Sequence, residues 1–304
     1  MIRQITLKKI LKLRAAILRE IRNYFSAAGY LEVETPFRIP APAPEAHIEA
    51  EPSGDWYLHP SPELCMKRLL ASGYPRIFQI CRCFRSRERG RRHLPEMTML
   101  EWYTAGHDYL DMMDQCESLI GALRNGLDIS QPLAYQGCRI DLSPPWERMT
   151  VAEAFQRFAA VSMQQALAEG RFDEILGLEI EPRLGISRPV FLHDYPVPCG
   201  SLARLKSDNP ALAERFELYI GGLELCNAYS ELTDTAEQRR RFERELALRK
   251  HAGKRIYPMP DLFLEQLTHM PPAAGNAMGV DRLVMLFADA AEIDAVVAFT
   301  PEEL

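Results

Sequence analysis

Two pairs of β-rich segments constrain the fold more than any other feature, because each pair can close into an antiparallel hairpin. Two such runs within residues 216–232 flank Gly221-Gly222, a dipeptide typical of tight two-residue hairpin turns. Residues 74–85 and 95–105 alternate in the manner of strands and are joined by a polar, arginine-rich loop. Helical patterns are segregated from these hairpins, which predicts an α+β fold rather than a doubly wound parallel sheet.

The rest of the chain carries helical periodicity and a few further strands. A capping box from Thr150 to Glu153 marks the start of one helix. No repeat, linker or low-complexity tail divides the chain, so we expect one domain over residues 1–304. The predicted helices cover residues 7–28, 61–73, most of 108–180, and 235–251, and the further strands lie at 30–36, 188–197 and at the start of 274–289.

Composition excludes several classes of protein. The 304 residues are 47% hydrophobic, enough for a large core, and the net charge is −6. An acidic chain is poorly suited to gripping nucleic acid as its main task. Charged residues interrupt every apolar run near the N-terminus, and no run reaches the ~20 apolar residues of a membrane span. We therefore expect a cytoplasmic protein without a membrane segment.

The seven cysteines are odd in number and scattered in spacing, which favours reduced thiols. Cys81 and Cys83 form a C-x-C pair within a predicted strand. No second Cys/His pair follows at zinc-finger spacing, so the sequence does not favour a structural metal there.

Basic residues around the first hairpin loop suit a phosphate group. Arg85 and His93 flank the loop, and Arg282 begins the last helix after Gly275 and Gly279. Arginine forks match phosphate oxygens, and a helix N-terminus favours an anion. Neither a P-loop nor a convincing dinucleotide-binding motif is present. A solvated, arginine-rich surface loop remains the alternative interpretation.

Two carboxylates of the second hairpin are candidates for a metal site. In an ideal two-residue hairpin Tyr219 opposes Glu224 and Glu217 opposes Cys226, so both glutamates point the same way. Such a pair beside a phosphate site suits Mg²⁺ bridging to a nucleotide, although two surface glutamates would look the same. Strict alternation turns Asn227 to the other face, unless a bulge lies near Cys226.

Acidic and aromatic residues offer a site for an organic cation. Burying an ammonium group requires charged partners or an aromatic face. Glu63, Glu101, Tyr103 and Glu231 provide both, although strand amphipathicity alone explains any one of them.

Taken together, these segments resemble a known family. "GYLEVETP", "FR…RRH-PEMTMLEWY" and "AGNAMGVDR" are similar to motifs 1, 2 and 3 of class II aminoacyl-tRNA synthetases. "SPELCMKRL" and "RFELYIGGLELCNAYSEL" resemble the lysyl branch in particular. The resemblance runs from about residue 10 to the C-terminus. It implies an antiparallel sheet flanked by helices and a homodimer formed near Pro36.

The resemblance also implies roles for individual residues. Arg85 and Arg282 would be catalytic, with ATP held by these two and by Glu88, His93, Glu217 and Glu224. Mg²⁺ would be held by Glu217 and Glu224. The amino-acid substrate would be held by Glu63, Glu101, Tyr103, Asn227, Glu231 and Ala277.

Three departures refine the comparison. The family's anticodon-binding barrel has no room before the first helix, so we expect no anticodon-binding domain and no tRNA acceptor. Ala277 stands where the synthetases have glycine. The usual FRxE glutamate is displaced by one, so Arg87 occupies its place and Glu88 follows.

A stand-alone lysyl core with an alanine at position 277 resembles the elongation factor P lysyltransferases. That resemblance implies ATP-dependent activation of (R)-β-lysine as an adenylate and transfer to the ε-amine of a lysine on elongation factor P. The acidic acceptor protein would suit the basic tip of residues 87–92. Two alternatives stay open: a truncated lysyl-tRNA synthetase paralogue acylating tRNA or a small amine, and an inactive paralogue that only binds.

Overall fold

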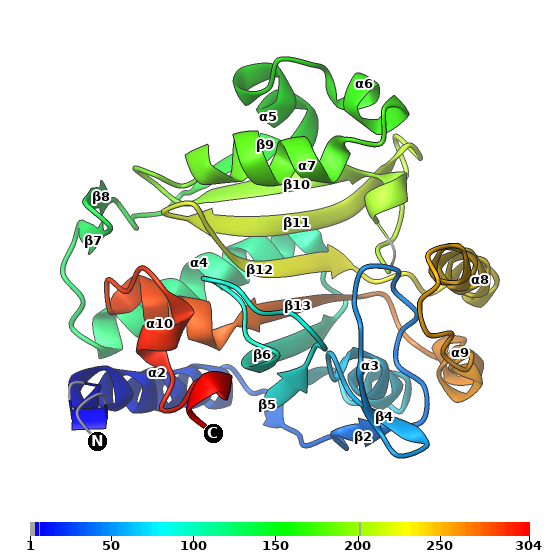
Figure 1. Cartoon of the computed structure of the whole chain (residues 1–304), viewed down its shortest axis with the longest axis horizontal. Coiled ribbons are helices and arrows are strands. Elements are labelled where there is room, and N and C mark those ends of the chain that lie inside the picture. Colours follow the sequence, from blue (N-terminus) through cyan, green and yellow to red (C-terminus); the bar gives the residue numbers. More distant parts are fainter. Residues whose placement is uncertain (1–3, 6, 201) are drawn as a thin grey trace.

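An eight-stranded sheet forms the centre of the computed structural model, which describes residues 4–5, 7–200 and 202–304 (Figure 1). The six central strands pair antiparallel, whereas the edge strands β1 and β9 run parallel to their neighbours. The α+β prediction is confirmed, with a sheet that is mixed at its edges. The strand order is β1 (Leu31–Glu32), β5 (Arg76–Phe84), β6 (Glu96–Ala105), β13 (Ala273–Gly279), β12 (Leu223–Ser230), β11 (Leu212–Ile220), β10 (Val190–Pro196) and β9 (Glu147–Thr150).

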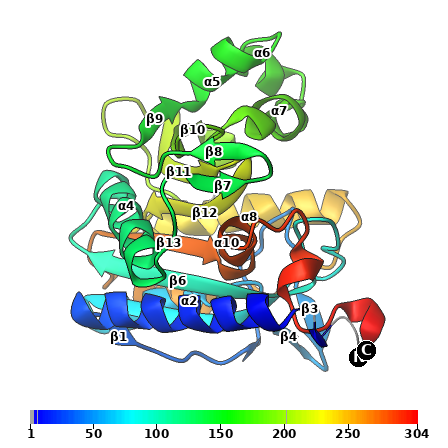
Figure 2. The same cartoon turned by 90° about the vertical axis from the view of Figure 1, so that its left-hand side faces the viewer.

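Three helices cover one face of this sheet with apolar side chains. Figures 1 and 2 both show α2 (Lys8–Ala27) along the lower part of the molecule, where it contacts α4 (Tyr109–Gly126) and α10 (Val280–Phe287). Phe25 of α2 stacks on Phe78 of β5 in this core. Because strand side chains alternate, the residues between the core positions project from the opposite face.

The opposite face is bordered by smaller elements that come from both ends of the chain. They are α3 (Glu63–Ala71), the three-stranded sheet of β2 (Arg38–Ile39), β3 (Glu51–Ser53) and β4 (Trp56–Leu58), and the helices α8 (Thr235–His251) and α9 (Asp261–Leu267). The predicted helices at 7–28, 61–73 and 235–251 are confirmed by α2, α3 and α8.

The β11–β12 hairpin carries a bulge beside Cys226, the condition under which Asn227 could share a face with Glu217. Gly221 and Gly222 both have positive φ, of 64° and 72°, which only glycine adopts without strain. Tyr219 opposes Glu224 as predicted, but Leu218 then opposes Cys226, so one extra residue is inserted in β12. The expected Glu217–Cys226 pair is therefore wrong.

Glu217 instead lies opposite Asn227. The extra residue reverses the alternation of β12 beyond Glu224, as a bulge does. Both residues then project from the same face of the sheet, toward the side that the three core helices leave open.

The region after α4 contains strands that the sequence pattern did not show. Residues 108–180 were expected to be mostly helical, but short strands interrupt the helices. The capping box at Thr150 is confirmed. The elements are β7 (Leu133–Tyr135), β8 (Cys138–Ile140), β9, α5 (Val151–Phe158), α6 (Met163–Ala168) and α7 (Phe172–Ile175). Three-residue strands are too short for a period-2 pattern to stand out.

Two further features of the fold concern the cysteines and the polarity of the helices. All seven cysteines carry free thiols. Among the described residues, the helices are either too short or too polar to cross a lipid bilayer.

Candidate active site

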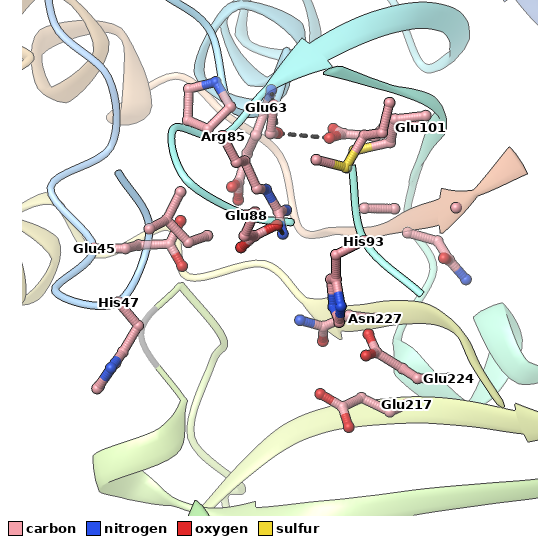
Figure 3. Close-up of a pocket in the computed structure, with 18 of the residues that line it drawn as sticks. Glu45, His47, Glu63, Arg85, Glu88, His93, Glu101, Glu217, Glu224 and Asn227 are labelled. Carbon is pink, nitrogen blue, oxygen red and sulfur yellow. Dashed lines mark hydrogen bonds and ion pairs between the residues drawn. The ribbon is translucent and has the colours of Figure 1, made fainter. Parts of the chain in front are cut away.

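A single cavity of about 610 Å³ opens on the polar face of the sheet and brings the predicted site residues together. Figure 3 shows Glu63 and Glu101 at one end, Glu217 and Glu224 at the other, and Arg85 between them. The predicted residues that line it are Glu63, Arg85, Glu88, His93, Glu101, Tyr103, Glu217, Glu224, Asn227, Glu231, Ala277 and Arg282. Segments more than 200 residues apart in sequence thus form one site.

Strand register explains why these side chains meet. Glu217, Asn227, Ala277 and Glu101 are successive cross-strand partners on β11, β12, β13 and β6. Cross-strand partners lie side by side on one face of a sheet, so the methyl group of Ala277 lies between an amide and a carboxylate. The small residue leaves the middle of the floor open.

The acidic end of the cavity already contains one ammonium group. The Nζ of Lys67 lies 2.5 Å from Oε1 of Glu63 and 2.5 Å from Oε2 of Glu231. It also lies 5.3 Å from the centre of the Tyr229 ring, whose hydroxyl donates to Glu63 at 2.8 Å. Burial opposes the charged form of Lys67, but the two carboxylates outweigh burial and raise its pKa.

Lys67 was not singled out from the sequence. Its signal was the four-residue spacing from Glu63 on one helix, which brings the two side chains to the same face. Glu63 and Glu231 contact this ammonium, and a third buried carboxyl group, Glu101, lines the same end of the cavity. The acidic end therefore has more carboxyl groups than Lys67 alone pairs with.

Glu231 and Gly275 define the space left for a second cation. Oε1 of Glu231 has no hydrogen-bond partner among the described residues, although the side chain is buried. A Cβ on Gly275 would lie 2.2 Å from this oxygen and 2.3 Å from the Tyr103 ring. Glycine is thus required at position 275, and the free oxygen is available to an ammonium donor.

Glu101 is held firmly at the floor of the same end. Its carboxylate accepts a hydrogen bond from the Ser61 hydroxyl at 2.5 Å and one from the Tyr103 hydroxyl at 3.0 Å. Burial and the neighbouring charge of Glu63 raise the pKa of Glu101 well above its usual value. A cation placed beside this group would favour its ionised form.

The opposite end of the cavity presents cationic groups together with one ionised carboxylate. Arg282 donates from Nη1 to Oε2 of Glu224 at 3.0 Å, and its Nη2 lies 2.6 Å from Nε2 of His93. Burial opposes ionisation of Glu224, but the charge and hydrogen bond of Arg282 outweigh it and lower the pKa of Glu224. Burial and the charge of Arg282 lower the pKa of His93, so its neutral form is favoured.

Arg85 lies between the two ends. Its Nη1 is 3.6 Å from Oε2 of Glu88, and its buried Nε has no hydrogen-bond partner among the described residues. A buried, unsatisfied guanidinium donor beside a cavity is suited to an anion such as a phosphate. Glu88 also lines the cavity, despite its one-residue displacement from the family pattern.

Glu217 is held by three residues that the sequence analysis missed. The hydroxyls of Tyr195 and Tyr219 both donate to its Oε2 at 2.6 Å, and Arg215 donates to its Oε1 at 2.6 Å. Arg215 also donates from Nε to the side-chain oxygen of Asn227 at 3.0 Å. Arg215 therefore joins two predicted site residues, and its position two residues before Glu217 was the only signal.

A further carboxylate, Glu181, lies near the pair of glutamates. Burial and the negative charges of Glu217 and Glu224 raise the pKa of Glu181 to about 7. Glu217 and Glu224 line the cavity and offer carboxylate oxygens, the ligands that Mg²⁺ prefers. The chemistry of these donors thus fits a divalent cation.

The basic tip of the first hairpin is not a free cationic patch. Arg89 pairs with Asp294 at 2.8 Å and with Glu302 at 2.9 Å, and Arg91 pairs with Glu292 at 3.0 Å. Part of the positive charge is thus balanced by the C-terminal segment.

Comparison with known proteins identifies the family to which this site belongs. The model of "tRNA synthetases class II (D, K and N)" matches residues 1–303. The chain belongs to this class II synthetase family. Arg85, Arg282 and Ala277 therefore lie in the segments that resemble its motifs 2 and 3.

Similar proteins within this class II family include lysine–tRNA ligases and elongation factor P–(R)-beta-lysine ligases. A lysine–tRNA ligase of Moorella thermoacetica is 38% identical over 96% of this chain, which spans only 65% of that relative. An elongation factor P–(R)-beta-lysine ligase of Erwinia tasmaniensis is 37% identical over 94% of this chain and 93% of that relative. The same named ligase of Yersinia enterocolitica is 38% identical, with the same shares covered.

Proposed function

We propose that the protein is an AMP-forming ligase that activates a lysine-like amino acid with ATP. The observation that carries the proposal is the polarity of one cavity, which has excess carboxyl groups at one end, Arg282 at the other, and an unsatisfied donor of Arg85 between them. An ammonium-bearing acid would bind with its amine at the acidic end and its carboxylate near Arg85. The triphosphate of ATP would then lie toward His93 and Arg282.

The first step would be attack of the substrate carboxylate on the α-phosphorus of ATP. A new O–P bond forms, the bond to the β-phosphate oxygen breaks, and pyrophosphate leaves. Arg85 would stabilise the charge that develops on the α-phosphate, while Arg282 and neutral His93 would hold the distal phosphates. Positioning and charge stabilisation supply most of the catalysis in such a transfer.

Glu217 and Glu224 would hold Mg²⁺. Their negative charges act on the nearby Glu181, which would add a third carboxyl group to the site. The ion, when bound, would neutralise phosphate oxygens. Tyr195, Tyr219 and Arg215 fix the orientation of the Glu217 carboxylate before any ligand arrives. Glu224 is kept ionised by Arg282, so it is ready to accept a cation.

In the second step an amine would attack the carbonyl carbon of the adenylate and release AMP. We propose (R)-β-lysine as the acid and a lysine ε-amine of elongation factor P as the acceptor. The support is that the named β-lysine ligases are matched over 93% of their length, whereas the lysine–tRNA ligase is matched over 65%. The methyl group of Ala277, between Asn227 and Glu101, would select the β-amino isomer by shaping the floor near the amine.

Lysylation of tRNA is the second candidate, because identity to the lysine–tRNA ligase is equally high at 38%. The chain's net charge of −6 disfavours it, since tRNA binding relies on phosphate neutralisation. A homodimer, by analogy with the family's motif 1, and a cytoplasmic location, on the ground of the odd number and scattered spacing of the cysteines, complete the proposal.

The test has two stages. ATP–pyrophosphate exchange should be stimulated by β-lysine more than by α-lysine, which would establish activation. Incubation with ATP, β-lysine and purified elongation factor P should then add one lysyl group to the acceptor, seen by intact mass. Efficient charging of total tRNA with no modification of the protein acceptor would refute the proposed acceptor.

A further inference from the structure

We propose that His59, Cys81 and Cys83 form a binding site for a thiophilic metal ion on the same face of the sheet as the cavity floor. Cys81 and Cys83 are two residues apart on β5, so their side chains project from the same face. Their sulfur atoms lie 3.9 Å apart. Two thiolates bound tetrahedrally to one zinc ion, with bonds of about 2.3 Å, have sulfurs about 3.8 Å apart.

The third ligand atom comes from a different part of the chain. A ring nitrogen of His59 and the two sulfurs all lie within 4.8 Å of one another, and all three residues are buried. The backbone of His59 is paired on both sides, with its N–H donating to Phe37 and its carbonyl accepting from Phe84. This pairing fixes the ring beside β5.

The tautomer of His59 suits a metal ligand. Its Nε2 lies 2.7 Å from the carbonyl oxygen of Arg82, and only a protonated Nε2 can donate to that acceptor. Nδ1 then carries a lone pair. This atom has no hydrogen-bond partner within the described ranges, although the side chain is only 1% exposed. Histidine ligands characteristically donate their second nitrogen to a carbonyl in this way.

Soft donors and charge indicate which ion would bind. The thioether of Met99 lies 3.9 Å from the Cys83 sulfur and offers a fourth, weak ligand. Thiolate and imidazole ligands suit Zn²⁺ or Cu⁺, whereas Mg²⁺ prefers oxygen. Two thiolates and a neutral imidazole balance the charge of Zn²⁺, which matters in a buried site. We therefore assign Zn²⁺, bound with release of the two thiol protons.

Such an ion would stabilise the acidic end of the cavity. His59 is two residues before Ser61, whose hydroxyl donates to Glu101 at 2.5 Å. Met99 lines the cavity and precedes Glu101 by two residues on β6. A metal joining the His59 segment to β5 would hold Ser61 and Glu101 in register.

The test uses the full chain, reduced and stripped of metal with a chelator, and Co²⁺ as a spectroscopic probe. We expect about one bound ion per chain, with a sulfur-to-cobalt charge-transfer band and the intense visible bands of a tetrahedral site. Zn²⁺ should bleach both bands. A competing Cu⁺ chelator distinguishes the two soft ions, and stronger retention of Cu⁺ than of Zn²⁺ would overturn the assignment of zinc.

Variants locate the site. Cys83→Ser and His59→Asn should each weaken Co²⁺ binding by at least the ~10–100-fold seen for changes around metal ligands. Cys138→Ser, a thiol on β8, is the matched control and should bind as the unmodified chain does. Circular dichroism checks that each variant is folded. Absence of the charge-transfer band in the unmodified chain, or its persistence in Cys83→Ser, would refute the site without affecting the proposed ligase activity.

Discussion

The Nζ of Lys67 lies 2.5 Å from Oε2 of Glu231, in an ion pair whose side chains are 1% and 0% exposed. The same ammonium reaches Glu63, so one helix side chain balances two carboxylates from separate parts of the chain. Because a third carboxyl group, Glu101, lies in the same end of the cavity, this end holds more carboxyl groups than one ammonium pairs with. The acidic end is thus stable in the free protein and still attractive to a cation.

Removing the Lys67 ammonium should lower the stability of the folded protein. Lys67→Met leaves two buried carboxylates unpaired, and we expect a loss of about 3–5 kcal/mol in the free energy of unfolding at neutral pH. Chemical denaturation measures it. The loss should shrink at low pH, where the carboxylates can take up protons. Arg22→Met is the control, because the Arg22–Glu32 pair is exposed and should contribute less than about 1 kcal/mol. Equal stability of the two variants would contradict the buried-pair argument.

Arg85 should be essential for activation and dispensable for folding. Arg85→Ala should lower amino-acid-dependent ATP–pyrophosphate exchange by about 10²–10³-fold, the typical effect of removing one donor to a developing charge. Arg282→Ala should have a similar effect. Arg87→Ala, an exposed neighbour on the same loop, should change exchange little. Normal exchange in Arg85→Ala, with thermal unfolding unchanged, would exclude the assigned role.

Ala277 should control the choice between lysine isomers. Ala277→Gly removes the methyl group between Asn227 and Glu101 and widens the floor. A methyl group in a pocket is worth about 1–3 kcal/mol, so we expect the ratio of kcat/KM for α-lysine over β-lysine to rise by about 10-fold or more. Exchange assays with each isomer measure the ratio. An unchanged ratio would show that the methyl group does not select the isomer.

Two glycines of motif 3 should respond differently to the same change. Gly275→Ala puts a Cβ within 2.3 Å of both Glu231 and Tyr103, so it should displace these side chains and raise the KM for the amino acid. Gly279→Ala meets its nearest atom at 3.8 Å and should fold with little loss of stability. Thermal unfolding and substrate titration of the two variants check the difference. Similar behaviour of both would mean that the space around Gly275 is not restrictive.

Glu181 should make stability depend on pH. Its pKa rises from 4.5 to about 7 on folding, so the folded state favours the protonated form. Stability linked to this group is therefore fully present below about pH 4.5 and is lost as pH rises toward 7. At 1.36 kcal/mol per pH unit the loss is at most roughly 3 kcal/mol.

Glu181→Gln removes this linkage. The variant should be more stable than the unmodified chain above pH 7, and the two should converge at acidic pH. Denaturation across this pH range gives the comparison. A difference between the two chains that does not vary with pH would show that Glu181 titrates normally.

Much of the fold could be predicted because its signals are local. The diglycine turn, the capping box at Thr150 and the periodicity of α2 each depend on residues close in sequence. The short strands β7 and β8 could not be predicted, because three residues show no usable alternation and their stability comes from pairing. The Glu217–Asn227 register required the bulge in β12, whose need was predictable but whose exact place was not.

The candidate site also has residues that could be predicted from the sequence and residues that could not. Motif order and spacing were enough to name twelve of the residues that line the cavity, and the family assignment agrees with them. Lys67 and Arg215 were missed, since a lysine or arginine in a helix or strand is ordinarily a solvated side chain. Only their burial beside carboxylates distinguishes them.

The sequence by itself determined the α+β class, the hairpins and the residue types available for chemistry, because these follow from local patterns. Only the tertiary structure decided which charges share a cavity and which balance one another. In the sequence, Arg89 and Arg91 belong to a cationic tip. In the folded chain, each forms an ion pair with a carboxylate of the C-terminal segment. In the sequence, Cys81 and Cys83 are a pair of thiols without a neighbouring ligand. In the folded chain, His59 lies next to them. Charge and ligand geometry depend on distances in space, and a linear pattern does not contain those distances.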